Sequence, residues 1–291
     1  MNPRVVVVGD VLIDELVDET GSRSFPGGSA LNVAVGLAIL GTPTTLVGMV
    51  GDDADGEMIR SYLAEWGVEA VLTLGPDGTG RALSDRRGGE PTYRFNQASK
   101  DRSIVFDESV REAFSSASIV AISGFPFDDA EQVELLTETL KQSGAAVAID
   151  PNPRSGLMRD RESFRANLEK VASSALLLKL GEEDAMLLYE MSLSSTISRL
   201  RLRLGSDILA TEGKGGASVY SATFSIHRPI AQVPSAIVDT MGAGDATFAV
   251  VLHALAARST LSPKGWYRVL DEAMLVAART IRHPGALLRH E

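Results

Sequence analysis

The run from Asp239 to Asp245 (Asp-Thr-Met-Gly-Ala-Gly-Asp) has the residue types that phosphate chemistry requires. The small residues at 242–244 leave backbone N–H groups free to close on an anion where a loop enters a helix, and the helix dipole adds to that attraction. Asp245 falls in the first helical turn, where its carboxylate can accept a proton from a hydroxyl that attacks a bound phosphorus atom. The run therefore predicts a phosphoryl-transfer site. The alternative is a tight turn in which Asp245 caps the helix.

A second run, from Gly27 to Asn32 (Gly-Gly-Ser-Ala-Leu-Asn), has the composition of a turn that a ligand can approach closely. Asn32 lies one helical turn beyond the two glycines, and its amide offers both a donor and an acceptor, as a polyol substrate needs. The run predicts a site for a hydroxyl-rich ligand. The alternative is that Asn32 caps a helix.

Other nucleotide and hydrolase motifs do not fit the chain. The glycines at 242 and 244 are not extended to GxGxxG, because residue 247 is threonine. No GxxxxGK[ST] run and no GxSxG run occurs. The sequence therefore argues against a Rossmann dinucleotide site, a P-loop enzyme and an α/β-hydrolase.

The composition narrows the function classes further. The net charge is −10, without the basic excess of a nucleic-acid binder, so we expect no nucleic-acid partner. The absence of cysteine excludes thiol catalysis and thiolate metal sites, and four scattered histidines without HExxH argue against a histidine-based metal centre. No apolar run approaches the roughly 18–20 residues that span a bilayer, and no signal-peptide core is present. We expect a cytoplasmic protein with no membrane partner.

Strand-like and helix-like stretches alternate along the chain. Runs of apolar residues predict strands at Val5–Val8, Thr44–Val50, Ile119–Ser123, Val147–Asp150, Leu176–Leu180, Ile208–Thr211 and Ala217–Tyr220. Helical spacing predicts helices at Asn32–Leu40, Asp53–Trp66, Asp129–Gln142, Glu162–Val171, Glu182–Tyr189, Thr196–Leu204, Asp245–Ala257 and Pro263–Arg282. This alternation indicates βαβ units, so the predicted fold class is α/β with a mostly parallel sheet in one domain.

Two stretches break the alternation. Residues 11–25 are acidic and turn-rich, and residues 79–97 are typical of a hairpin, with strands at Thr79–Asp85 and Thr92–Gln97 and a turn at 86–89. Both are predicted to leave the main sheet and form a small separate sheet. The alternative is a pair of surface loops.

The two glycine-rich runs together resemble the paired signatures of the PfkB (ribokinase-like) family of carbohydrate kinases. The amino-terminal signature matches at Gly27, Gly28, Ala30, Asn32, Ala34, Gly41 and Gly51. The carboxy-terminal signature matches at Asp239, Thr240, Gly242, Ala243, Gly244, Asp245 and Ala249, and departs at Val250, where the family usually has Gly or Ala. The resemblance covers nearly the whole chain. It implies a three-layer α/β/α fold with a β-sheet lid formed by residues 11–25 and 79–97.

The resemblance also implies roles for individual residues. Asp245 would be the base that deprotonates the sugar hydroxyl, and the backbone of Gly242, Ala243 and Gly244 would hold the transferred phosphoryl group. The residues expected to contact the sugar or its phosphate are Asp14, Gly28, Asn32, Arg94 and Arg154. Those expected at the nucleotide are Lys179, Thr211, Gly213, Gly216, Gly285 and Ala286. ATP and Mg²⁺ are the implied cofactors, and Asp239 matches the position near a K⁺ site that some members use.

One motif departs from the family pattern. The family's Asn-x-x-Glu motif, which handles magnesium and phosphate, aligns with Gly181-Glu182-Glu183-Asp184, so the Asn is missing and Asp replaces Glu. Asp184 or Glu183 could still act through water on a hydrated Mg²⁺. The pattern from Lys179 to Asp184 is close to the Lys-x-Ser-x-Glu-Asp of bacterial fructokinases. The alternative is a solvated, acidic helix start.

The acceptor is predicted from weaker signals. The run from Asp150 to Arg154 (Asp-Pro-Asn-Pro-Arg) is similar to a segment of fructokinases and 2-keto-3-deoxygluconate kinases, and a Pro-rich turn is its structural alternative. Fructose is the leading prediction. The keto-acid sugar is second, because its carboxylate would need a further cation in the lid. The lid arginines that keep this acceptor possible are Arg81, Arg86, Arg87 and Arg94. A nucleoside acceptor and a catalytically inactive, ligand-binding relative are the remaining alternatives, and the family suggests a homodimer through the lid.

Overall fold

A computed structural model describes residues 3–19, 21–85, 87, 92–258 and 260–290 of the chain. Its central sheet has nine strands in the order β13-β12-β11-β10-β9-β8-β1-β4-β5. Their bounds are β1 Val5–Gly9, β4 Thr44–Val50, β5 Glu69–Leu74, β8 Ile119–Ser123, β9 Ala146–Asp150, β10 Leu177–Gly181, β11 Asp207–Thr211, β12 Ala217–Tyr220 and β13 Ser225–Arg228. The strands from β5 to β11 in this order are parallel, and β12 and β13 add antiparallel strands at one edge. The predicted α/β class with a mostly parallel sheet is confirmed.

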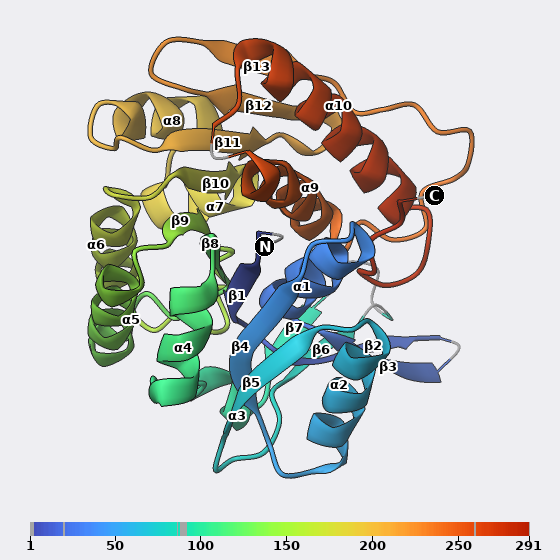
Figure 1. Ribbon diagram of the computed structural model, residues 1–291. Coiled ribbons are helices and arrows are strands. Elements are labelled where there is room, and N and C mark those ends of the chain that lie inside the picture. The colour runs from blue at the N-terminus through green and yellow to red at the C-terminus, as the bar shows by residue number, and fades with distance from the viewer. Residues whose placement is uncertain (1–2, 20, 86, 88–91, 259, 291) are drawn as a thin grey trace.

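Helices cover both faces of this sheet (Figure 1). Their bounds are α1 Ser29–Ile39, α2 Ala54–Glu65, α3 Gln97–Lys100, α4 Glu108–Ser116, α5 Ala130–Ser143, α6 Arg161–Ala172, α7 Glu182–Tyr189, α8 Leu193–Arg201, α9 Ala243–Ala257 and α10 Pro263–Thr280. Strand β1 shows why both faces need a cover. Val5 and Val7 contribute to the core under α1, α9 and α10, whereas Val6 and Val8 contribute to the core under α4–α8. Because successive side chains of a strand point to opposite faces, an unbroken valine run requires two apolar cores.

A second, four-stranded sheet lies beside the central one, next to α1 and α2 (Figure 1). Its strands are β2 Leu12–Asp18, β3 Gly21–Gly27, β6 Arg81–Asp85 and β7 Thr92–Phe95, in the order β3-β2-β6-β7. The predicted small separate sheet is therefore present, and its hairpin pairs Ala82 with Phe95. Of the predicted turn at 86–89, residues 86, 88 and 89 lie outside the described part of the chain.

The elements differ from prediction mainly at their ends. Helix α1 begins at Ser29 rather than Asn32, because strand β3 ends at Gly27 and Gly28 serves as the N-cap. Helix α8 begins at Leu193 rather than Thr196, because the Ser192 side chain accepts a hydrogen bond from the backbone N–H of Ser195. Strands β5 and β13 and helix α4 were not predicted. Each of these elements is short, and a short segment carries too few residues to show a clear strand or helix period.

Among the described helices, none combines the length and the apolar composition that crossing a bilayer requires.

Candidate active site

The candidate site forms where the parallel strands of the central sheet end. Strand β8 ends at Ser123, which pairs with Gly9 of β1 on one side and with Asp150 of β9 on the other. Strand β10 ends at Gly181, in register with Thr211 of β11. Parallel strands bring their carboxyl ends to one edge of a sheet, and ligands bind at that edge in open α/β folds.

Asp245 reaches this edge from the first turn of α9. Its Oδ1 accepts a hydrogen bond from Ser29 Oγ at 2.8 Å and its Oδ2 accepts one from Asn32 Nδ2 at 2.9 Å. Gly242 is the N-cap of α9, and no side chain caps the helix. Asp245 is therefore directed at α1, which removes the interpretation as a capping carboxylate. Asn32 is likewise an interior residue of α1 and not a cap.

Burial raises the pKa of Asp245, and the nearby Asp150 carboxylate raises it further. Lys179 and the hydrogen bonds from Asn32 and Ser29 act in the opposite direction. The residue is only partly removed from solvent, so an incoming hydroxyl can reach it. A carboxylate with a raised pKa and an open lone pair is suited to accept a proton.

A buried ion pair lies beside Asp245. Lys179 Nζ is 2.7 Å from Asp150 Oδ2, and the side chains of the two residues are 7% and 0% exposed. Burial favours the neutral lysine, but the pKa of Lys179 is raised overall because Asp150, Asp184 and Asp245 all favour its charged form. A Cβ on Gly244 would lie 3.2 Å from Lys179 Nζ, so the ammonium adjoins the loop predicted to hold phosphate.

The same loop packs against the end of the chain. Gly242 has φ +75°, and a Cβ there would lie 2.5 Å from the carbonyl oxygen of Ala286. Glycine is needed at this position both for its conformation and for the close approach. The structure thus places Ala286, which follows Gly285, against the loop predicted to hold phosphate.

The remaining predicted nucleotide residues lie on the connection between β11 and β12. Thr211 ends β11 beside Gly181, and Gly213 (φ +49°) and Gly216 (φ +103°) flank a short 3₁₀ turn. A Cβ on Gly216 would lie 2.1 Å from the carbonyl oxygen of Arg228, so this connection is tightly folded against the next strand.

Asp14 extends from strand β2 of the small sheet over the glycines that precede α1. A Cβ on Gly27 would lie 2.0 Å from Asp14 Oδ2, and the backbone N–H of Gly28 donates a hydrogen bond to the carboxylate. Burial raises the pKa of Asp14 to about 7, opposed by Arg154 and supported by Asp245. A carboxyl group of the small sheet and the Asp245 carboxyl at the start of α9 therefore lie close enough to influence each other.

Arg154 contributes positive charge close to these carboxyl groups. It follows β9 in the connection that begins at Asp150, and Asn152 within that connection has φ +37°, which is uncommon for a residue other than glycine. Burial raises the pKa of Asp10, Asp14 and Asp184, and the positive charge of Arg154 opposes the rise at all three. Its guanidinium therefore lies within electrostatic range of the three carboxyl groups. The Asp150–Arg154 connection therefore adds positive potential to the candidate site.

The predicted lid arginines are not brought to Asp14. Paired strand residues share a face of their sheet, and the register places Asp14 with Ala82 and Phe95, whereas Arg94 is opposite Leu83 on the other face. Arg94 is exposed there. Arg81 pairs with Asp55 at 2.5 Å and with Glu15 at 3.2 Å, Arg87 pairs with Asp85 at 2.6 Å, and residue 86 lies outside the described chain.

The predicted metal residues occupy different environments. Asp184 is buried in the first turn of α7, and its Oδ2 accepts a hydrogen bond from the backbone N–H of Gly181 at 2.7 Å. Burial raises its pKa, and Lys179 opposes the shift. Glu183 is exposed at the same helix start. Asp239 is buried, and its Oδ1 accepts a hydrogen bond from the backbone N–H of Met241 at 3.1 Å, so it shapes the turn before the phosphate loop.

These residues fit a hydrated Mg²⁺ better than a directly caged one. Within the described residues, no three acidic or histidine side chains lie close enough to hold a metal ion. Asp150 Oδ1 is buried without a hydrogen-bond partner among the described atoms, which leaves one hard oxygen for a water or an ion. Mg²⁺ usually retains several waters and binds through one or two carboxylates together with substrate phosphates.

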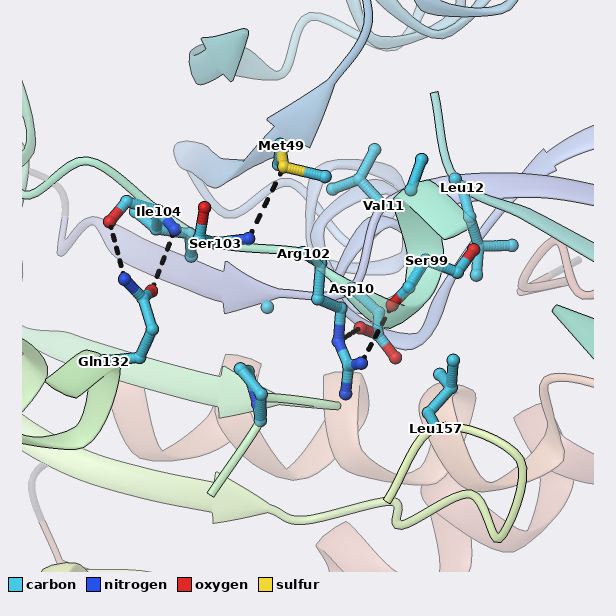
Figure 2. Close-up of a pocket in the computed structure, with 14 residues that line it drawn as sticks. Asp10, Val11, Leu12, Met49, Ser99, Arg102, Ser103, Ile104, Gln132 and Leu157 are labelled. Carbon is cyan, nitrogen blue, oxygen red and sulfur yellow. Dashed lines mark hydrogen bonds and ion pairs between the residues drawn. The ribbon is translucent and has the colours of Figure 1, made fainter. Parts of the chain in front are cut away.

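A pocket adjoins the group around Asp14 (Figure 2). Arg102 enters it from the segment after α3, with its Nε 2.7 Å from Asp10 Oδ1 and its Nη1 donating to the carbonyl oxygen of Ser99 at 3.0 Å. Burial raises the pKa of Asp10, opposed by Arg102 and Arg154. The other walls come from Val11, Leu12, Met49, Ser103, Ile104, Gln132 and Leu157. The ion pair links two of the chain connections between the central sheet and the small sheet, the one from β1 to β2 and the one from β7 to β8.

Sequence reasoning missed several residues of the site. Ser29 and Ser123, which are joined by a hydrogen bond of 2.6 Å, were not singled out, nor was the Asp10–Arg102 pair. Serine carries no distinctive signal in a sequence. For Asp10 a signal existed, since an acidic residue directly after a buried strand is expected at the carboxyl edge of a parallel sheet.

Comparisons with known proteins agree with this fold. A family model described as pfkB family carbohydrate kinase matches residues 2–288. The fructokinases of Klebsiella pneumoniae and Salmonella typhimurium are 32% and 31% identical over 267 and 276 residues, each alignment covering 88% of this chain and 86% of the relative. A solved fructokinase from Xylella fastidiosa with bound ATP is similar with a TM-score of 0.84 at 26% identity, over 98% of this chain and 94% of that one.

The three-layer fold and the site at its strand ends define a ribokinase-like phosphotransferase. The chain belongs to the PfkB family of carbohydrate kinases. Its class of reaction is the transfer of a phosphoryl group to an alcohol acceptor.

Proposed function

We propose that this protein is an ATP-dependent fructokinase that transfers the γ-phosphoryl group to a primary hydroxyl of fructose. The observation that carries the proposal is the carboxylate of Asp245, held by Ser29 and Asn32 between the Gly242–Gly244 loop and Asp14. The relatives named as fructokinases and the ATP-bound Xylella fastidiosa structure support the choice of acceptor and donor.

In this mechanism the acceptor sugar binds between Asp14, Gly28, Asn32 and Arg154. Asp245 accepts the proton of the attacking hydroxyl as the oxygen approaches phosphorus. The backbone N–H groups of residues 242–244 stabilise the charge that develops on the transferred phosphoryl group, and the helix dipole of α9 adds to this.

The nucleotide occupies the other half of the site in this proposal. Thr211, Gly213, Gly216, Gly285 and Ala286 surround it, and Lys179 neutralises phosphate charge from beside Gly244. Mg²⁺, when bound, screens the phosphates, with Asp184 and Asp150 as the carboxylates suited to hold its waters and Glu183 at the rim. Asp239, which shapes the turn before the phosphate loop, is the residue through which K⁺ dependence would act.

The small sheet acts as a lid in this proposal, because Asp14 on β2 contacts the acceptor only when that sheet covers the site. Closure would exclude water and suppress ATP hydrolysis.

We further propose a homodimer through this sheet, whose strand β7 exposes Tyr93. Sedimentation velocity of the wild-type protein would test it, with a single monomeric species as the contrary result.

A neutral sugar is favoured over 2-keto-3-deoxygluconate by the lid arginines. Arg81 and Arg87 are paired with carboxylates, and Arg94 faces away from Asp14. A carboxylate acceptor would need a further cation from the lid beside Arg154, and these three arginines do not offer one.

The testing experiment measures ADP release from MgATP with fructose, 2-keto-3-deoxygluconate, ribose, tagatose 6-phosphate and adenosine. Fructose should give the highest kcat/KM, and Asp245→Asn should lower kcat by about 10²- to 10⁴-fold, the usual contribution of a general base. Asp207→Asn is the matched control. Burial also raises the pKa of Asp207, but this residue lies at the amino end of β11, away from the site. Turnover that survives in Asp245→Asn would contradict the proposed base, and a preference for another acceptor would contradict the proposed sugar.

A further inference from the structure

A chain of three side chains leads from the candidate base into the protein interior. Ser123 Oγ and Ser29 Oγ are 2.6 Å apart, and Ser29 Oγ is 2.8 Å from Asp245 Oδ1. Ser123, at the end of β8, is fully buried, and Ser29, the first residue of α1, is 6% exposed. The three residues come from three separate elements, and no sequence motif connects them.

The direction of the hydrogen bonds follows from the chemistry of the groups. An ionised carboxylate only accepts hydrogen bonds, so the single hydroxyl proton of Ser29 is donated to Asp245. Ser29 Oγ must then accept the proton of Ser123. Each bond in such a series polarises the next, so Ser123 strengthens the hydrogen bond from Ser29 to Asp245.

The two donors to Asp245 lie on one face of α1. Ser29 and Asn32 are three residues apart, which places them side by side on a helix. One donates to Oδ1 and the other to Oδ2, so the plane of the carboxylate is fixed. Each oxygen keeps a further lone pair for the acceptor hydroxyl.

We propose that Ser29, supported by Ser123, is a positioning residue for the base: it fixes the orientation of the Asp245 carboxylate and stabilises the ionised form that accepts the acceptor's proton. The inference rests on the proposed function, because it takes Asp245 as the base. Both serines are outside the residues that the family resemblance assigns.

The charged groups around Asp245 make the pH dependence predictable. They are Asp150 on β9, Lys179 on β10 and Asp14 on β2, with the uncharged donors Ser29 and Asn32 on α1. Burial and then Asp150 raise the pKa of Asp245, whereas Lys179 and the hydrogen bonds of Asn32 and Ser29 lower it. Removal of the Ser29 hydroxyl should therefore raise this pKa and move the acid limb of the kcat–pH profile to higher pH.

The experiment compares Ser29→Ala, Ser123→Ala and the double variant with wild type. A hydrogen bond to a charged group is lost, so Ser29→Ala should lower kcat by about 10- to 100-fold. The KM for the sugar should change less than about threefold, since the serine does not contact the acceptor, and the acid limb should shift by about one pH unit. Ser123→Ala should lower kcat and shift the acid limb in the same directions as Ser29→Ala, but by less. The double variant should resemble Ser29→Ala, because the two serines act through one hydrogen bond to Asp245.

Controls separate positioning from general damage. Ser206→Ala removes a buried hydroxyl between α8 and β11, outside the site, and should leave kcat and the pH profile unchanged. Ser29→Thr keeps a hydroxyl and should recover most of the lost kcat. Should Ser29→Ala fold poorly, Ser123→Ala carries the test.

Two results would overturn the inference. One is a Ser29→Ala enzyme with wild-type kcat and an unshifted acid limb while Asp245→Asn is inactive. The other is an Asp245 pKa that does not change in Ser29→Ala, measured by carbon-13 NMR titration of the carboxyl in the free protein; the inference expects this pKa to rise whether or not the protein turns over. A wild-type protein that phosphorylates none of the acceptors would contradict the proposed function, and the titration would still decide the role of Ser29.

Discussion

The buried pair of Lys179 and Asp150 gives a sharp prediction about stability. Replacement of Lys179 by methionine keeps the length of the side chain and removes its charge. Asp150 is fully buried, and it would then face Asp184 and Asp245 with no buried cation between them. The change therefore leaves an unpaired charge in the interior.

The expected loss can be worked from the geometry. Lys179 Nζ and Asp150 Oδ2 are 2.7 Å apart, and both side chains are almost fully removed from water. Breaking a buried pair by removing one partner typically costs about 3–5 kcal/mol, because the remaining charge is uncompensated. For a chain of this size each kcal/mol lowers the melting temperature by about 2–4 °C, so a fall of about 10 °C is expected.

Thermal unfolding at pH 8 is the assay, and Lys179→Met should melt well below wild type. Asp150→Asn added to Lys179→Met removes the unpaired charge by mutation, and the double variant should regain most of the lost stability. Lys141→Met, which removes an exposed lysine from the last turn of α5, is the control and should change the melting temperature by no more than a degree or two.

The reasoning would be refuted by a Lys179→Met protein as stable as the Lys141→Met control. It would also be refuted if Asp150→Asn gave no recovery in the Lys179→Met background. In either case the pair would not be the compensating interaction that its burial and distance indicate.

Three further perturbations test other parts of the site. Burial raises the pKa of Asp14 to about 7, so ionisation of this group destabilises the free protein progressively as pH rises from about 4 to 7. Asp14→Asn should therefore raise the melting temperature at pH 8, by an amount that disappears at pH 4; an equal shift at both pH values would contradict this. Gly242→Ala adds a Cβ 2.5 Å from the carbonyl oxygen of Ala286 at a φ of +75°, so calorimetry should show weaker ATP binding, and unchanged affinity would count against the loop as a phosphate site. Arg102→Met leaves Asp10 buried without its partner, and urea unfolding should show a loss of about 3 kcal/mol, with a wild-type midpoint as the contrary result.

Much of the fold could be predicted from local patterns. The valine run at Val5–Val8, the helical spacing from Asp129 and the glycine-rich runs all act over a few residues, and each has a direct physical consequence for the backbone. Boundaries were less predictable, because the ends of α1 and α8 depend on which of several adjacent small residues caps the helix. Nor could the sequence predict which side chains of a lid strand lie on the same face as Asp14. Arg94 and Phe95 are neighbours in sequence, but the register of β6 and β7 turns only one of them toward Asp14.

The sequence by itself determined the α/β class, the order of the elements and the loop that precedes Asp245, since these follow from residue types within short windows. Only the tertiary structure decided the partners of that carboxylate. Ser29 and Asn32 are 216 and 213 residues away along the chain, and Lys179 and Asp150 meet because β9 and β10 are adjacent in the sheet. Hydrogen bonds and ion pairs act over about 3 Å in space. Which groups come that close is set by strand order and helix packing, and these depend on the whole chain.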